Sequence, residues 1–184
     1  MRPRYREERA TQIACRLLQL HDGQMSYMKL IKLMYLIDRE ALVSWGRPLT
    51  FDRYVSMNEG PVLSRTYDLI KNALPPDTDS YWQRFIGPAT DYSVKLESDE
   101  FPSDELSDAA TDLIARVFRE HGSKQRWELV GWTHEHLPEW QDPDGSAIPI
   151  QHRDILRAAG KTDIQISEVE DDIEALALAD QVFG

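Results

Sequence analysis

The sequence has little cysteine, since its 184 residues include one, Cys15, which rules out a disulfide within the chain. Cys15 lies among apolar residues in the stretch IACRLL, which favours a small buried side chain over a reactive thiol. No apolar run approaches the roughly 18 residues that a bilayer span requires. The basic start MRPRYREER has no apolar block behind it, as a secretory signal would. These absences predict a cytoplasmic protein without a membrane partner.

Basic residues are also outnumbered, with 21 Lys and Arg against 32 Asp and Glu, so that the net charge is −11. Residues 1–60 contain 10 Lys and Arg against 7 Asp and Glu, whereas residues 61–184 contain 11 against 25. Binding nucleic acid regardless of sequence requires a basic face for the phosphates, so we expect no nucleic-acid partner. A DNA-binding regulator is a weak alternative, since the second helix of the predicted pair 7–20 and 26–43 is too apolar for a groove. The acidic balance suits a basic protein partner, although acids that only maintain solubility are the favoured explanation of the charge taken alone.

The usual catalytic signatures are missing as well. There is no glycine-rich nucleotide loop, and Ser64 in GPVLSRT lacks the Gly-x-Ser-x-Gly pattern of a nucleophile. His134 and His136 lie two residues apart, a spacing that directs their rings apart on a helix. In a loop they could share a metal with a third ligand from His121, His152 or a distant acid. We therefore predict no catalytic residue, no metal and no cofactor, with a metal-dependent hydrolase as a weaker alternative.

Helical periodicity dominates what the sequence does contain. Ser26 and Ser107 are placed to cap helices, and Gly46 and Gly122 to end them. The acidic end of the chain, from residue 167 to residue 183, also has an apolar stripe. Helices are predicted within residues 7–20, 26–45, 61–74, 108–122, 124–137, 148–160 and 167–183.

Strand patterns are few and short. Residues 49–57 alternate like an extended segment, and residues 81–86 and 91–98 resemble a hairpin joined by GPAT. Between them, Gly60-Pro61 is typical of a helix start, because proline fits the first helical turn. The predicted fold is mostly α (α+β): a compact helical domain, residues 1–160, with a small β-hairpin or short antiparallel sheet mid-chain. Residues 161–184 are predicted to form an acidic helix packed on this domain or extending from it.

An ordered set of short motifs resembles the Panacea domain of the SocA-like antitoxins, also described as phage-associated GepA-like proteins. An apolar helix with Lys-Leu-x-Tyr precedes a Trp-Gly-x-Pro turn, an extended segment and a Gly-Pro-Val junction. A later helix ends in Thr-His, followed by a tryptophan. The resemblance covers residues 10–160, and the matching positions are Lys32, Leu33, Tyr35, Trp45, Gly46, Pro48, Tyr54, Gly60, Pro61, Val62, Thr133, His134 and Trp140.

The resemblance implies a bacterial or phage antitoxin that neutralises a cognate toxin by direct protein binding, without enzymatic activity. Some proteins of this kind resemble adaptors that deliver the toxin to a Clp-type protease, which is the alternative function. Two positions depart from the family pattern. Glu139 separates Pro138 from Trp140, and Asn58-Glu59 replaces an aromatic residue before Gly-Pro.

Candidate partner-binding residues come from two residue types. Aromatic side chains dominate contact energies at interfaces, and acids could face a basic toxin. For each of them an ordinary role, in the core or on a solvated helix face, is the competing interpretation. The candidates are Tyr81, Trp82, Trp127 and Trp140 among the aromatics, and Glu168, Glu170, Asp171 and Asp172 in the C-terminal helix.

Overall fold

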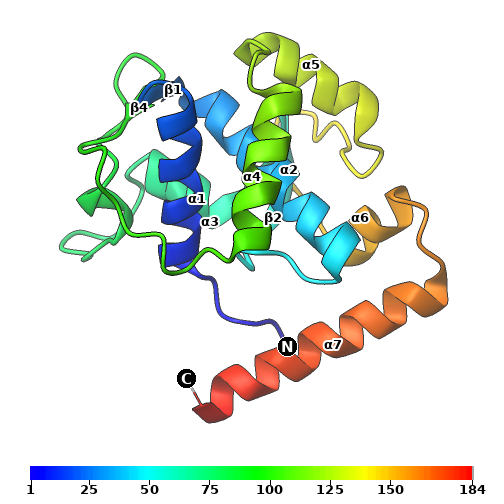
Figure 1. Cartoon of the computed structure of the whole chain (residues 1–184). Coiled ribbons are helices and arrows are strands. Elements are labelled where there is room, and N and C mark those ends of the chain that lie inside the picture. The colour runs from blue at the N-terminus through cyan, green and yellow to red at the C-terminus, as the bar shows by residue number, and fades with distance from the viewer. Residues whose placement is uncertain (184) are drawn as a thin grey trace.

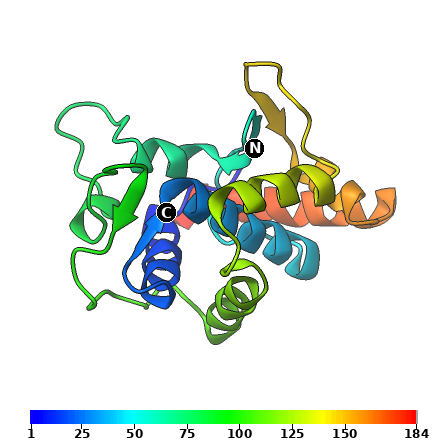
Figure 2. The same ribbon diagram turned by 90° about the horizontal axis from the view of Figure 1, so that it is seen from above.

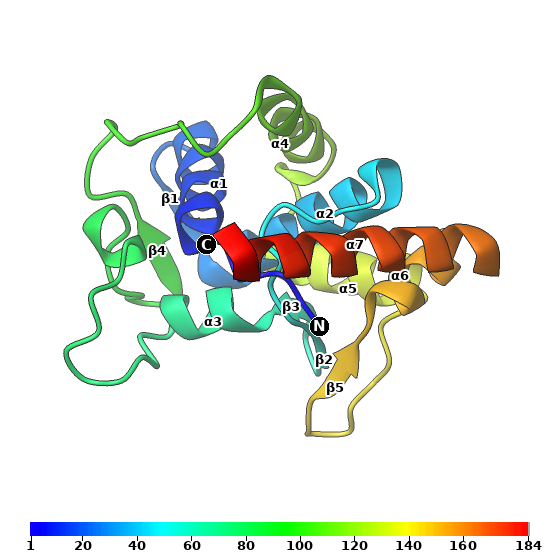
Figure 3. The same ribbon diagram turned by 90° about the horizontal axis from the view of Figure 1, so that it is seen from below.

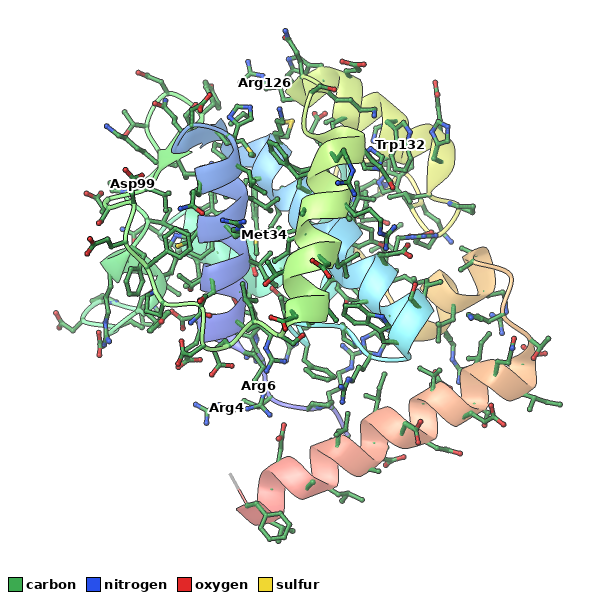
Figure 4. All side chains as sticks on the ribbon, viewed as in Figure 1. Arg4, Arg6, Met34, Asp99, Arg126 and Trp132 are labelled. Atoms are coloured by element: carbon green, nitrogen blue, oxygen red, sulfur yellow. The ribbon has the colours of Figure 1, made fainter. Side chains whose placement is uncertain are left out.

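The computed structural model describes residues 1–183 and is built around one buried helix, α2 (Tyr27–Trp45). Its apolar residues occupy nearly every face, so other elements must cover it on several sides. In Figure 1, α1 (Glu7–Leu20) and α4 (Asp108–His121) stand in front of it and α5 (Arg126–His136) lies above. Figure 4 shows Met34 of α2 directed into the region between α1 and α4, where its side chain is buried.

Three further helices complete the α-helical part. α3 (Ser64–Ile70) and α6 (His152–Ala158) are short and contact α2 from the side of the sheet. The view from above separates the helical layers around α2, with β5 projecting beyond them (Figure 2). The long α7 (Asp163–Phe183) runs across the underside, beneath α2 and α6 (Figure 3). A 3₁₀ turn, Trp82–Arg84, lies in the connection between α3 and α4.

Two small antiparallel sheets accompany the helices. β1 (Gln24–Ser26) pairs with β4 (Ser93–Lys95). β2 (Tyr54–Met57) is the middle strand of the other sheet, between β3 (Gly60–Leu63) and β5 (Ile148–Ile150). The predicted fold class, mostly α with a small antiparallel sheet, is thus confirmed. The helices were predicted at nearly their observed positions, including the cap of α4, where the Ser107 hydroxyl accepts a hydrogen bond from the Ala110 N–H.

The prediction that Gly60-Pro61 starts a helix is wrong. Both residues belong to β3, which pairs with β2 so that Met57 lies opposite Gly60 and Ser56 opposite Pro61. Helix α3 begins at Ser64, and its first N–H groups are capped by the distant Asp52, whose carboxylate accepts from the Arg65 and Thr66 amides at 2.9 Å each. Pairing with β2, and a helix cap supplied by the earlier residue Asp52, therefore determine the structure here, and the local preference of proline for a helix start does not.

The predicted hairpin over residues 81–98 is wrong in its partner. Its first half is the 3₁₀ turn, and its second half, β4, pairs with β1, a strand that the sequence did not indicate. Only an isolated bridge between Ile86 and Leu96 links the two halves. Ser26 precedes α2 as expected, but its hydroxyl makes no capping bond.

Helix α7 covers the body of the protein through a narrow seam. Its buried residues are Ile166, Ile173 and Ala177, which lie on one face at helical spacing. Ion pairs supplement this seam, including Arg6 with Asp180 at 2.7 Å. Among the described residues, no helix combines the length and the apolar character that a membrane crossing requires.

Gly60 is held by two constraints that can be tested separately. Its φ is +100°, and a Cβ at this position would lie 2.7 Å from Thr133 Oγ1. Gly160 has a similar φ of +83° but open space around it. We expect Gly160→Ala to lower the free energy of unfolding by about 1–2 kcal/mol through backbone strain alone. Gly60→Ala should cost about 1–3 kcal/mol more because of the clash. Urea denaturation measures both, and equal losses would contradict the close approach.

Candidate functional site

The structure brings most of the family-motif residues together in one place. They come from α2, from the β2–β3 hairpin and from α5 with the segment that follows it. These three parts are far apart in the chain but adjacent in space. We call the residues that meet here the motif cluster: Lys32, Tyr35, Tyr54, Gly60, Pro61, Thr133, His134 and Trp140.

Lys32 joins α2 to the hairpin. Its side chain is fully buried, and its Nζ donates a hydrogen bond to the Pro61 carbonyl at 2.9 Å. Burial lowers the pKa of this amine to about 7, while the nearby charge of Glu59 acts in the opposite direction. The absence of a side chain at Gly60 leaves the space that Lys32 and Thr133 occupy. The Gly-Pro pair is therefore the point where the hairpin rests on α2 and α5.

Tyr35 joins α2 to the segment after α5. Its hydroxyl donates to Glu139 Oε1 at 3.0 Å, and Arg39, one turn further along α2, donates to both oxygens of the same carboxylate at 2.6 and 3.2 Å. Glu139 is buried, so this two-pronged pairing compensates its charge. Burial and the adjacent Glu139 charge raise the pKa of Tyr35 well above its ordinary value, so its phenol stays a donor.

Asp38 is a member of this network that the sequence did not reveal. Its side chain is 0% exposed and accepts from the Leu49 amide at 2.9 Å, the Thr50 amide and hydroxyl, and the Tyr54 hydroxyl at 3.0 Å. Burial raises the pKa of the Asp38 carboxyl to about 6, and these donors counteract the rise. The only sequence signal was an acid within an apolar helix, because its partners lie 11 to 16 residues away.

The end of α5 folds back onto the hairpin turn. The ring of His134 stacks on Trp140 with centroids 3.8 Å apart, and Trp140 Nε1 donates to the Met57 carbonyl at 2.9 Å. His136 instead stacks on Trp132, one turn back along the helix. The two histidines thus take part in different contacts. No three His, Cys, Asp or Glu side chains within residues 1–183 are placed to hold a metal ion together.

The other motif residues have separate positions. Leu33 and Val62 are buried in the core. Gly46 ends α2 in the left-handed conformation, with φ of +71°, and Pro48 is buried in the turn that follows. Trp45 is 43% exposed beside α7 and takes no part in the cluster.

The residues predicted as a partner surface do not form one surface. Trp82 is buried, with 2% exposure, so for it the core interpretation holds and the surface interpretation is wrong. Tyr81 is half-buried against Phe85, whereas Trp127 is 57% exposed at the start of α5. The acids lie on α7, at the opposite end of the molecule from α5 (Figure 1). Among them Glu168, Asp171 and Asp172 are exposed and Glu170 pairs with Arg153 at 2.6 Å.

Comparison with protein families identifies the class of protein that this arrangement represents. The model of the antitoxin SocA-like family, Panacea domain, matches residues 30–141, which is more than half of the chain. The chain therefore belongs to the SocA-like antitoxin family. The match runs from α2 to the residue after Trp140, so it contains the whole motif cluster and excludes α1, α6 and α7. Comparison with curated proteins and with solved structures gives no match.

The pairing of Glu139 can be tested by removing its carboxylate. We expect Glu139→Ala to lower the free energy of unfolding by about 2–4 kcal/mol, because Arg39 and Tyr35 lose their shared acceptor. The matched control is Arg84→Ala, which breaks the exposed Arg84–Asp79 pair and should leave the free energy of unfolding nearly unchanged, because solvent screens this pair. Urea denaturation measures both, and a Glu139→Ala loss as small as the control would show that the network contributes no stability.

Proposed function

We propose that the protein is a non-enzymatic antitoxin that neutralises one cognate toxin by binding it directly. The observation that carries this proposal is the family match over residues 30–141. A toxin partner follows from the family in general terms, and direct neutralisation is the simplest mode for a chain with this architecture. The motif cluster consists of buried stacking, hydrogen-bonding and ion-pair contacts between α2, the hairpin and α5, which fits a binding scaffold.

The contact surface is also a proposal. Trp127 and the exposed acids Glu168, Asp171 and Asp172 are available for contact, but they lie at opposite ends of the molecule. We further propose that residues 161–184 act as a helical extension of the domain formed by residues 1–160. No contact in the described part of the chain favours delivery to a protease over direct binding.

The test is growth rescue with the product of the adjacent gene. We expect that gene to arrest growth when expressed alone and to be tolerated when this protein is co-expressed. A copy of this gene with an early stop codon is the control. A pull-down from the rescued cells should recover a stable complex. A harmless neighbour, or rescue without a complex, would contradict direct neutralisation. A toxin half-life that shortens on co-expression would instead support the adaptor function.

A further inference from the structure

A pocket of about 250 Å³ lies next to the motif cluster. It opens between α2, the hairpin turn, α3 and the turn around Gly145. Its lining is mixed. Apolar and aromatic side chains come from α2, from β3 and from α3, and the polar residues Asn58, Glu59 and Ser146 lie at the hairpin turn and at the turn around Gly145. Since a water molecule takes up about 30 Å³ in the liquid, this space suits one side chain of a partner protein.

Lys32 also lines this pocket and is its one cationic residue. An ammonium group has three N–H donors. Within the described residues, the Pro61 carbonyl is the acceptor that hydrogen-bonds to Lys32 Nζ. A buried amine with spare donors at the side of a partly apolar pocket is matched by a group that combines apolar atoms with an anionic oxygen.

We propose that this pocket, the Lys32 pocket, receives a carboxylate-bearing side chain of the toxin, whose apolar stem packs against Tyr27 and Tyr67. The inference rests on the proposed function for the identity of the partner. A carboxylate accepts the spare N–H groups and compensates the buried charge, which neutral amides do only in part. Glu59 at the same pocket carries the like charge and thus opposes the incoming group.

The proposal predicts effects of opposite sign at two neighbouring residues. Lys32→Met removes the amine but keeps a side chain of similar length, and we expect the toxin to bind about 10- to 100-fold more weakly. Glu59→Gln removes the opposing charge and should tighten binding by a few-fold, on the order of 3-fold. Isothermal titration with the purified toxin identified by growth rescue measures both. Weaker binding by Glu59→Gln would show that the occupant is not an anion.

A second pair of variants leaves Lys32 unchanged. Met28→Trp fills the pocket from its half-buried wall, and we expect a loss of affinity of about tenfold or more. The matched control is Ala159→Trp, which adds the same side chain at an exposed position at the end of α6, outside the pocket and outside the candidate contact residues, and should bind like the wild type. Thermal melts show that each variant is folded before its affinity is compared. Unchanged affinity in both Lys32→Met and Met28→Trp overturns the proposal.

The pH dependence provides a readout that a purely structural lysine would not give. Because burial lowers the pKa of the Lys32 amine to about 7, a bound carboxylate should favour uptake of a proton. Affinity should then fall as pH rises from about 7 to about 9, and Lys32→Met should remove this dependence. The other titratable groups nearby are Glu59 on the hairpin turn, Tyr27 on α2, Tyr67 on α3 and Lys71, which hydrogen-bonds Tyr27. Tyr27, Tyr67 and Lys71 remain in Lys32→Met, so this variant also serves as the control for any pH dependence that comes from these phenols and this amine.

A small probe separates failure of the pocket from failure of the proposed function. Hydrocinnamate carries a phenyl ring and a carboxylate, and hydrocinnamamide is its neutral counterpart. We expect the acid, and not the amide, to shift the Lys32 side-chain NMR resonances of the wild-type protein. If neither probe shifts the Lys32 resonances, the proposed chemistry of the pocket is contradicted, whatever the toxin is. Absence of any complex between the wild-type protein and the toxin contradicts the proposed function instead.

Discussion

The structure depends on polar side chains that α2 carries into the core. Burying a charged group is costly unless it is hydrogen-bonded and compensated, so each such residue dictates where its partner must lie. Asp38 fixes the turn after α2 and the start of the hairpin, Lys32 fixes the hairpin corner, and Tyr35 fixes the segment after α5. The apolar faces of α2 would accept many packing arrangements, whereas these bonds select one.

This constraint relates the family pattern to function. The family motif includes residues that hold three distant segments of the chain together. The Lys32 pocket lies at the edge of this framework, where α2 meets the hairpin. For the proposed function, a rigid framework reduces the entropic cost of binding, because little of the contact surface must be ordered when the toxin binds. Helix α7 lies outside the family match and adds an acidic face.

The sequence predicted those parts of the structure that have local causes. Apolar periodicity located the helices, and Ser107 and Gly46 marked ends that the structure confirms. Gly60-Pro61 was misread because proline is a local helix-start signal, while the pairing with β2 and the Asp52 cap are non-local. β1 and β5 have three residues each, which is too short for a periodic pattern. The motif cluster was found by resemblance, but its bonds were not: Glu139, a departure from the family pattern, contacts residues about 100 positions earlier.

The central claim is that buried polar bonds from α2 make the irregular segments part of the core. Native-state hydrogen exchange tests it most directly at Leu49 and Thr50, whose amides lie outside any helix or strand and donate to Asp38. The account predicts that both amides exchange only with an opening free energy close to that of global unfolding, as the amides in the middle of α2 do. The Ser146 amide, in an exposed turn, should exchange through small local openings. Exchange of Leu49 and Thr50 as fast as that of Ser146 would contradict the claim.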